Sequence, residues 1–262
     1  MQSNTKIYLY VIKLTVVIAA VLSVLYTSLN PLFLLNKEKA KKTQILNCIP
    51  DQQSSVADIA SVYDEKVLTI LLDAKGTVLF EQKEAGKQDD NPDAKAVLAK
   101  LNERGLGVKY AKLVDVDLSS EEKFPLEKRV YPIYKYVADG GTSYYVTSVR
   151  GNGLWDKIWG YIALEKKDNN WLIAGVNFDH KNETPGLGAE IKDSKDFKDQ
   201  FKEKQIFDAA GNYVSVAVLK KGIKHPEYQV KAISGATVTS VGVSDMLHKG
   251  IGYYLPYLES LK

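Results

Sequence analysis

An apolar stretch near the N-terminus constrains what this 262-residue chain can fold into more than any other feature. Residues 7–29 read IYLYVIKLTVVIAAVLSVLYTSL, and Lys13 is the only charged residue among them. About twenty apolar residues in a helix, at about 1.5 Å per residue, cross the hydrocarbon core of a bilayer. Lys13 lies near one end, where its side chain can snorkel, and tyrosines near both ends suit the two interfaces. We therefore predict a tail and one transmembrane anchor in residues 1–30, which contacts the lipid bilayer through residues 7–29.

A cleaved signal peptide is the alternative to an anchor. The apolar stretch is longer than the core of a usual signal peptide, and the following NPLFLLNKEKAKK contains no A-x-A-like cleavage site. We therefore predict that the helix is retained and spans the membrane once. More lysines follow the stretch than precede it, so the positive-inside rule alone places the large C-terminal part in the cytoplasm.

Composition limits the remaining classes of function. With 45% hydrophobic and 26% charged residues, the chain has the composition of an ordinary globular protein with an anchor. The formal net charge of +3 and the interleaving of Lys with Asp and Glu indicate a solvated surface, so we predict no nucleic-acid partner. Cys48 is the only cysteine and the three histidines are far apart, so we predict no metal site.

The rest of the chain alternates between strand-like and helix-like patterns. Residues 31–60 predict a juxtamembrane helix and a linker, and residues 61–262 predict one domain. Tight turns join strongly β-prone runs, which favours antiparallel pairing; the turns are at residues 74–76, 139–141 and 168–170. Helical patterns cover residues 91–105, 194–204 and 239–261, and short strand-like runs cover 212–220 and 227–233. The predicted fold class is α+β, a largely antiparallel sheet with flanking helices.

Two glycine-bearing segments suggest contact with a flat ligand. In SVRGNGLWDKIWGYIAL, residues 148–164, glycines let the backbone approach a ligand closely, and Leu154 and Trp155 would present apolar surface beside it. A hairpin turn with core tryptophans explains this segment alone more simply. In NETPGLGAEI, residues 182–191, a tight Pro-Gly loop offers free N–H groups that could bind the edge of a heterocycle, or could be only a turn. It lacks the third glycine of a dinucleotide-binding fingerprint.

A third segment, KAISGATVTS at residues 231–240, crowds hydroxyl groups around Gly235 before the last helix. The N–H groups of a first helical turn are unpaired and lie at the positive end of the helix dipole, which favours a phosphate. Thr237, Thr239 and Ser240 would add donors to it. Ordinary N-capping by Thr239 or Ser240 is the alternative. One hydroxyl suffices for a cap, but the residues alone leave both interpretations open.

In family order, GLW…GYIAL, ETPGLGAE and SGAT resemble the flavin-binding domain of the C subunit of the sodium-translocating NADH:quinone oxidoreductases. The G subunit of RNF-type electron-transport complexes shares this domain but is usually shorter, so the C subunit is favoured. The resemblance runs from the anchor to the last helix. It implies a flavoprotein subunit that relays electrons between NADH and quinone, without a catalytic residue of its own.

The resemblance also implies roles for individual residues. The last threonine of SGAT, here Thr237, would be joined to FMN by a phosphoester bond. The phosphate would be held by the neighbours of Thr237, which are Ser234, Gly235, Ala236, Thr239 and Ser240. The isoalloxazine would be lined by Glu183, Thr184, Leu187 and Gly188, with Leu154 and Trp155 nearby.

The partners implied by the resemblance are the other membrane subunits and a flavin transferase that uses FAD and Mg²⁺. The family's motif usually has an aspartate three residues before the serine, whereas Lys231 stands there in this chain. The family's flavin domain faces the periplasm from the bacterial inner membrane, and we prefer that orientation to the one the lysines favour. A cofactor-free anchored binding domain and a domain that binds FMN non-covalently are the alternatives.

Overall fold

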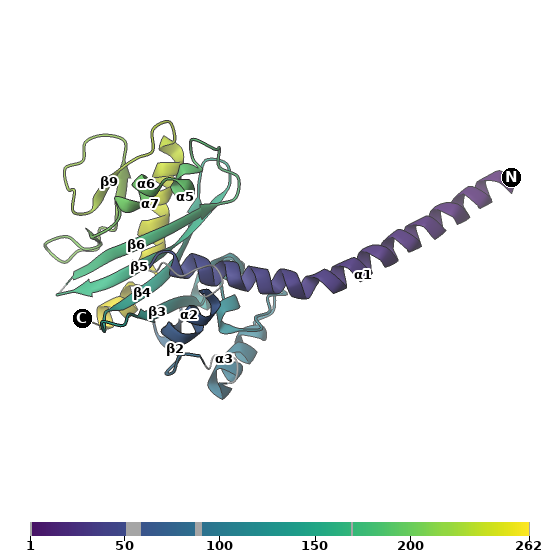
Figure 1. Ribbon diagram of the computed structural model, residues 1–262, viewed down its shortest axis with the longest axis horizontal. Coiled ribbons are helices and arrows are strands. Elements are labelled where there is room, and N and C mark those ends of the chain that lie inside the picture. Colours follow the sequence, from purple (N-terminus) through teal and green to yellow (C-terminus); the bar gives the residue numbers. More distant parts are fainter. Residues whose placement is uncertain (1, 51–58, 87–90, 169, 262) are drawn as a thin grey trace. The chain divides into compact units, whose positions relative to one another are not determined.

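The structure is a computed structural model that describes residues 2–50, 59–86, 91–168 and 170–261 (Figure 1). The chain divides into two units between Lys41 and Lys42. Helix α1 (Gln2–Leu46) contains Pro31, so the predicted juxtamembrane helix is the C-terminal part of α1 and not a separate element. A proline removes one helical hydrogen bond but need not end a helix whose flanks both favour it. Among the described residues, Asn4–Leu46 is the one helix whose length and composition suffice to cross a membrane.

The second unit begins with the last turn of α1, not at residue 61 as the sequence predicted. Ile45, Leu46 and Cys48 are buried in a cluster that also contains Tyr63 and Tyr134. The Lys42 ammonium and the Asp64 carboxylate form an ion pair of 2.8 Å at the edge of this cluster. Residues 51–58 of the predicted linker lie outside the described residues.

The core of the second unit is a sheet with the strand order β2-β1-β3-β4-β5-β6-β7. Every neighbouring pair is antiparallel, which confirms the predicted fold class. The strands are β1 (Val67–Leu72), β2 (Val78–Glu81), β3 (Tyr131–Val137), β4 (Ser143–Asn152), β5 (Lys157–Lys167), β6 (Asn170–His180) and β7 (Lys204–Gln205). Tight turns link β1 to β2 and β3 to β4, as the sequence predicted, and residue 169 of the turn predicted at 168–170 lies outside the described residues.

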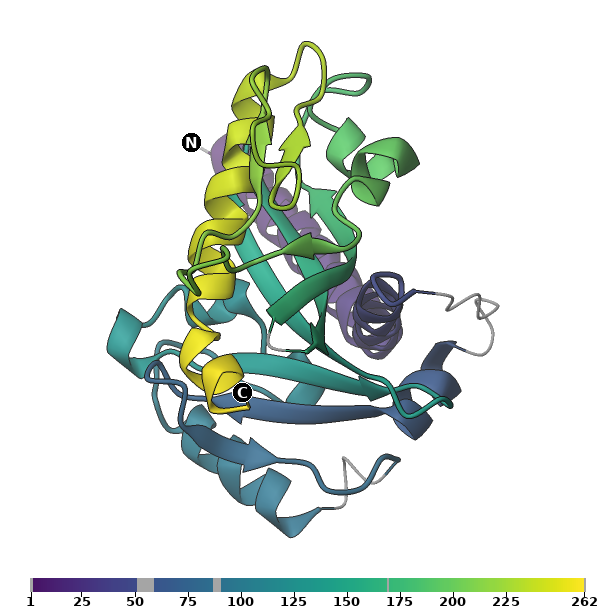
Figure 2. The ribbon, with the colours of Figure 1, turned by 90° about the vertical axis from the view of Figure 1, so that its left-hand side faces the viewer.

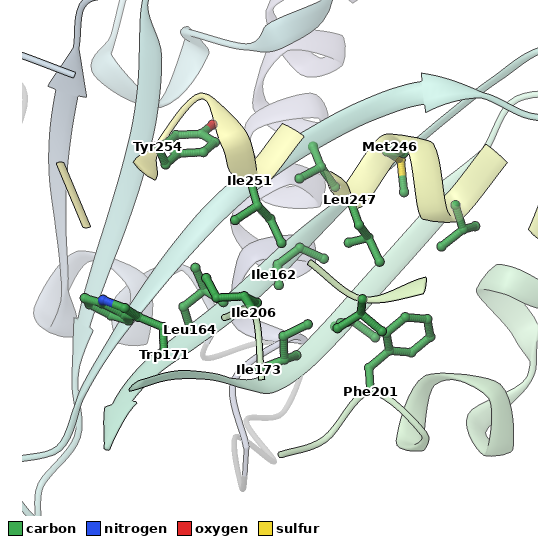
Figure 3. Close-up of a cluster of buried hydrophobic side chains, with 14 of the residues drawn as sticks. Ile162, Leu164, Trp171, Ile173, Phe201, Ile206, Met246, Leu247, Ile251 and Tyr254 are labelled. Atoms are coloured by element: carbon green, nitrogen blue, oxygen red, sulfur yellow. The ribbon is translucent and has the colours of Figure 1, made fainter. Parts of the chain in front are cut away.

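The two faces of the sheet carry different hydrophobic clusters, because side chains alternate along a strand. On one face, α7 (Thr237–Gly252) packs along the strands (Figure 2). Leu247 and Ile251 of α7 point toward Ile162 of β5, with Trp171 and Phe201 in the same cluster (Figure 3). The other face carries the cluster that contains the end of α1. The packing against the sheet therefore positions α7.

The remaining elements are short. They are α2 (Ile59–Lys66), α3 (Pro92–Asn102), α4 (Leu118–Glu121), α5 (Glu190–Asp193), α6 (Lys195–Asp199), α8 (Leu255–Ser260), β8 (Ala217–Leu219), β9 (Gln229–Lys231) and two 3₁₀ turns, Leu113–Asp115 and Leu126–Lys128. The helix predicted over 194–204 is limited to α6, since Lys204 and Gln205 pair with β6 as β7. The strands predicted over 212–220 and 227–233 shorten to β8 and β9, which pair in parallel.

Gly175 provides a test of how the start of the second unit is attached to the sheet. A Cβ at Gly175 would lie 2.3 Å from the carbonyl oxygen of Cys48, whereas a Cβ at Gly140 would meet nothing within 4 Å. We expect Gly175→Ala to lower the free energy of unfolding by about 1–3 kcal/mol, because backbone must move to relieve the overlap. Gly140→Ala is the matched control and should be nearly neutral. Denaturant unfolding in detergent measures both, and equal midpoints would contradict the expectation.

Candidate functional site

Glu183 links three segments that are far apart in the sequence. Glu183 lies on the loop after β6 and is only 4% exposed. The backbone N–H of Trp155, between β4 and β5, donates to Glu183 Oε1 over 2.9 Å. The Thr239 hydroxyl, in the first turn of α7, donates to Glu183 Oε2 over 2.6 Å. The N–H of Glu183 itself donates to His180 Nδ1 over 3.2 Å.

Two glycines leave the space that this carboxylate occupies. A Cβ at Gly153 would lie 2.4 Å from Glu183 Oε1, and a Cβ at Gly188 would lie 2.4 Å from Glu183 Oε2. A Cβ at Gly242 of α7 would lie 2.3 Å from the carbonyl oxygen of Asn152, so the helix and the β4–β5 loop are in direct backbone contact. Gly153 and Gly188, from the first two motifs, therefore make room for the Glu183 carboxylate. Gly242 allows α7 to pack directly against the backbone of the β4–β5 loop.

The electrostatics of the site keep Glu183 ionised. Burial raises the pKa of its carboxyl group, but hydrogen bonds from Thr239, Trp155 and Asp156 outweigh burial and hold the pKa below its ordinary value of 4.5. The negative charge is thus part of the folded structure at neutral pH. It lies beneath the first turn of α7, where the dipole of the helix favours an anion.

Helix α7 starts at Thr237 without a side-chain cap. Its N-cap residue is Ala236, and neither Thr239 nor Ser240 caps it, so the capping alternative is wrong. Thr239 is bonded to Glu183, and the Ser240 hydroxyl accepts a hydrogen bond from the N–H of Ile233. Both side chains are buried and support the turn from inside. Among the described residues, the first N–H of α7 with a helical partner is that of Ser240, which donates to Ala236.

Exposed apolar side chains surround this helix start. Trp155 is 68% exposed, so it is not the core tryptophan of the simpler interpretation. Its indole Nε1–H donates to the Thr184 hydroxyl over 3.2 Å, which joins the first two motifs. Gly235 has φ +78°, and a Cβ there would lie 2.8 Å from Leu187 Cδ2, so the second and third motifs also touch. We call the exposed set the apolar rim; it comprises Leu154, Trp155, Leu187, Val238 and Val241.

Two members of the apolar rim were not predicted from the sequence. Val238 and Val241 are exposed on the first turns of α7, three residues apart. That spacing puts both valines on the same side of a helix. Two apolar residues on the side of α7 that faces away from the sheet were the sequence signal that could have identified them. His180 was not among the predicted site residues, and its ring accepts the N–H of Glu183 and so orients the loop. Thr237 is half-buried, while Ser234 and Gly235 are exposed beside it.

The arrangement suits a ligand with an anionic end and a flat apolar end. The unpaired N–H groups at the start of α7 favour the anion, and the apolar rim offers a surface for the ring. The FMN-binding domain family matches residues 153–252, which include all three motifs from Leu154 to the end of α7.

Curated relatives and solved structures match most of the chain. The C subunit of the Na(+)-translocating NADH-quinone reductase of Pseudomonas aeruginosa is 30% identical over 81% of this chain and 82% of its own length. The C subunit of the Pasteurella multocida enzyme is 28% identical over 89% and 85%.

Two solved structures extend the comparison. The crystal structure of the C subunit from Parabacteroides distasonis is 30% identical, with a TM-score of 0.61 over 85% of this chain and 93% of that one. Shewanella oneidensis NqrC, at 21% identity and a TM-score of 0.64, shares the fold. By its sequence, its fold and its FMN-binding domain, this chain belongs to the family of C subunits of the Na(+)-translocating NADH-quinone reductases.

Proposed function

We propose that this chain is a membrane-anchored electron carrier that holds FMN covalently through Thr237, within a sodium-translocating NADH:quinone oxidoreductase. Electrons that entered the complex from NADH would pass through it toward quinone. The observation that carries the proposal is a half-buried threonine at the first position of an uncapped helix, next to an exposed apolar rim. The names of the relatives support the complex, and the long apolar α1 supports the anchor.

The residues at the start of α7 fit the phosphate of FMN. A phosphoester on Thr237 Oγ1 keeps a negative charge, which the unpaired N–H groups of the first turn and the helix dipole stabilise. The exposed hydroxyl of Ser234 is available as a further donor. Thr239 and Ser240 contribute by holding the backbone of this turn in place, because their hydroxyls are bonded within the protein.

The apolar rim fits the isoalloxazine ring. Bound FMN supplies reversible electron transfer, and the protein binds and orients the ring and excludes water from part of it. Leu187, Leu154 and Trp155 offer apolar contact, and Thr184, held by the Trp155 indole, offers a polar edge. Glu183 and Gly188 lie beneath this surface and fix the geometry of the loops.

Intact-mass measurement of the protein co-expressed with a flavin transferase tests the proposal. We expect a mass increase of one FMN in phosphoester linkage, mapped to a peptide within residues 232–249. Acid precipitation should leave the yellow colour in the pellet. Release of all colour into the supernatant would contradict covalent attachment and favour non-covalent binding, and an unmodified, colourless protein would contradict both.

The proposed orientation places the second unit in the periplasm, against the bias of the lysines that follow the apolar stretch. Assembly with other membrane subunits can override a weak charge bias on a single helix. A reporter that is active only in the periplasm, fused after the C-terminus, should be active in cells. Activity of a cytoplasmic reporter at the same place would reverse the orientation.

Lys231 is expected to slow recognition by the flavin transferase. It lies in β9 with an exposed side chain, while its backbone N–H donates to Gln200 Oε1 over 2.8 Å. We expect Lys231→Asp, which restores the family's usual residue, to raise the rate of flavin incorporation a few-fold at limiting transferase. Lys224→Asp is the control, because it makes the same charge change on another exposed residue. Equal incorporation rates in the wild type and Lys231→Asp would contradict the expectation.

A further inference from the structure

A cavity of about 240 Å³ lies beside α7, apart from the residues proposed to hold FMN. One wall is formed by the second half of α7 and by Tyr253, and the other by β4, β5 and the segment around α4. Asp245 in the first wall is eight residues beyond Thr237, or about 12 Å along the helix. No residue assigned above to FMN lines this cavity.

The cavity has an excess of positive charge. Four cationic side chains line it, those of Arg129, Arg150, Lys157 and Lys249, together with three carboxylates, those of Glu121, Glu122 and Asp245. Glu121 is fully buried and is neutralised from outside the cavity, because both terminal nitrogens of the Arg104 guanidinium donate to it over 2.6 and 2.9 Å. Glu122 is bonded to Arg150 Nε over 3.0 Å. Glu121 and Glu122 are thus paired with arginines. Asp245 is the remaining carboxylate in the lining, and it can balance only one of the three positive charges of Arg129, Lys157 and Lys249.

The two lysines are available to a ligand. Within the described part of the chain, neither Lys157 nor Lys249 has a carboxylate within ion-pair distance of its ammonium group. Arg129 Nε donates to the carbonyl oxygen of Phe124, and Arg129 Nη2 donates to that of Glu122. The remaining guanidinium nitrogen, Nη1, can donate to a ligand. Lysine and arginine donors arranged in this way bind carboxylate and phosphate oxygens.

Tyr131, which has a buried hydroxyl, also lines the cavity. Tyr131 is 1% exposed, and its hydroxyl has no hydrogen bond of good geometry among the described residues, although the Arg129 side chain lies close enough to act on it. Its ring is held by stacking on Tyr253, with the ring centres 4.8 Å apart. Burial raises the pKa of Tyr131 to about 12, although Arg129 opposes the shift, so the hydroxyl remains a proton donor at neutral pH. A buried donor left unpaired costs free energy, which a ligand oxygen would recover.

We propose that this cavity binds a small organic anion through a carboxylate or phosphate group, with Lys157, Lys249, Arg129 and the Tyr131 hydroxyl as donors. The volume suits a molecule of a few carbon atoms, since cavities for drug-sized ligands begin at about 300 Å³. The proposal does not depend on FMN. It concerns a second site, which shares with the first the scaffold of α7, β4 and β5 but none of the residues assigned to FMN.

Calorimetric titration of the full-length protein in detergent tests this site, with succinate, inorganic phosphate and the uncharged succinamide as probes. We expect saturable binding of succinate or phosphate at physiological ionic strength and none of succinamide. Preference for succinate identifies a carboxylate site, and preference for phosphate identifies a phosphate site. Absence of saturable binding by both anions would overturn the proposal.

Three variants separate binding from folding. We expect the double variant Lys157→Gln with Lys249→Gln to weaken anion binding at least about tenfold, since it removes two charged donors and a tenfold change corresponds to about 1.4 kcal/mol. Lys220→Gln, at an exposed lysine outside the cavity, is the control and should bind normally. Tyr131→Phe should weaken binding without lowering the unfolding temperature, because the hydroxyl it removes has no hydrogen bond of good geometry among the described residues. Unchanged affinity in both the double variant and Tyr131→Phe would overturn the proposal.

The FMN site and this cavity are distinguished by Thr237→Ala. That variant should bind the anion as the wild type does, although it carries no covalent flavin. Loss of anion binding in Thr237→Ala would mean that the cavity is not an independent site, and would overturn the proposal without bearing on the flavin attachment.

Discussion

Thr237→Ala is expected to remove all flavin fluorescence from the protein band on a denaturing gel, whereas the wild type matured with flavin transferase keeps it. The threonine Oγ1 is the atom that would carry the phosphoester, and alanine has none. Thr239 and Ser240 cannot replace it, because their side chains are buried and bonded within the protein. Thr237 is half-buried and its hydroxyl makes no hydrogen bond to the described residues, so the stability should change by about 1 kcal/mol or less.

Two matched variants make this result specific. Thr237→Ser keeps a hydroxyl at the same place and should retain some fluorescence. Ser234→Ala removes an exposed hydroxyl three residues away and should retain nearly all of it. Fluorescence that persists in Thr237→Ala but disappears in Ser234→Ala would move the attachment to Ser234. A dark wild-type band, in the presence of an active transferase, would contradict covalent attachment.

Glu183→Ala is expected to lower the free energy of unfolding by about 3–5 kcal/mol, because it leaves buried donors without an acceptor. The Thr239 hydroxyl and the Trp155 N–H both lose their partner, at the point where three segments meet. Thermal unfolding in detergent should show a fall of roughly 10 °C in the midpoint for a unit of this size. Flavin incorporation should fall with it, since the start of α7 loses its support.

Glu190→Ala is the control for this variant. Glu190 begins α5 on the same loop, and its side chain makes no hydrogen bond to the described residues, so its loss should change stability by about 0.5 kcal/mol or less. Equal unfolding midpoints for Glu183→Ala and Glu190→Ala would show that Glu183 does not organise the site.

The contribution of Glu183 should also depend on pH. Its pKa in the folded state is lowered from 4.5, so the stabilisation is complete above pH 4.5 and is lost as the pH falls through the folded-state value. The difference in unfolding free energy between the wild type and Glu183→Gln should therefore be largest at neutral pH and narrow below pH 4.5. A difference that stays constant from neutral pH to strongly acid pH would contradict an ionised Glu183.

The long strands were predictable from the sequence because their patterns are local. β3 to β6 are runs of seven to eleven residues rich in β-branched and aromatic side chains. β8 and β9 have three residues each, and their parallel pairing joins segments about ten residues apart, so no local pattern fixes their length. The hydroxyl-rich turn placed the start of α7 within two residues, but the helix predicted over 239–261 is divided into α7 and α8.

The functions of single residues within the candidate site were harder to predict. Gly153 was interpreted as permitting the close approach of a ligand, and Gly188 as lining the isoalloxazine. In the structure both glycines make room for the Glu183 carboxylate. Thr239 was interpreted as a phosphate donor, and its hydroxyl is bonded to that same carboxylate. The role of Thr239 depends on a contact between residues 56 positions apart, which only the folded chain brings together.

Where the second unit begins determines how a water-soluble fragment of this protein should be cut. A fragment that starts at residue 61 lacks Ile45, Leu46 and Cys48, which cover one face of the sheet. Tyr63 and Tyr134 of the same cluster would then be exposed to solvent. Newly uncovered aromatic surface of this kind promotes aggregation. A fragment that starts just before Lys42 retains the cover and the partner of Asp64, and should stay monodisperse at concentrations where the shorter one precipitates.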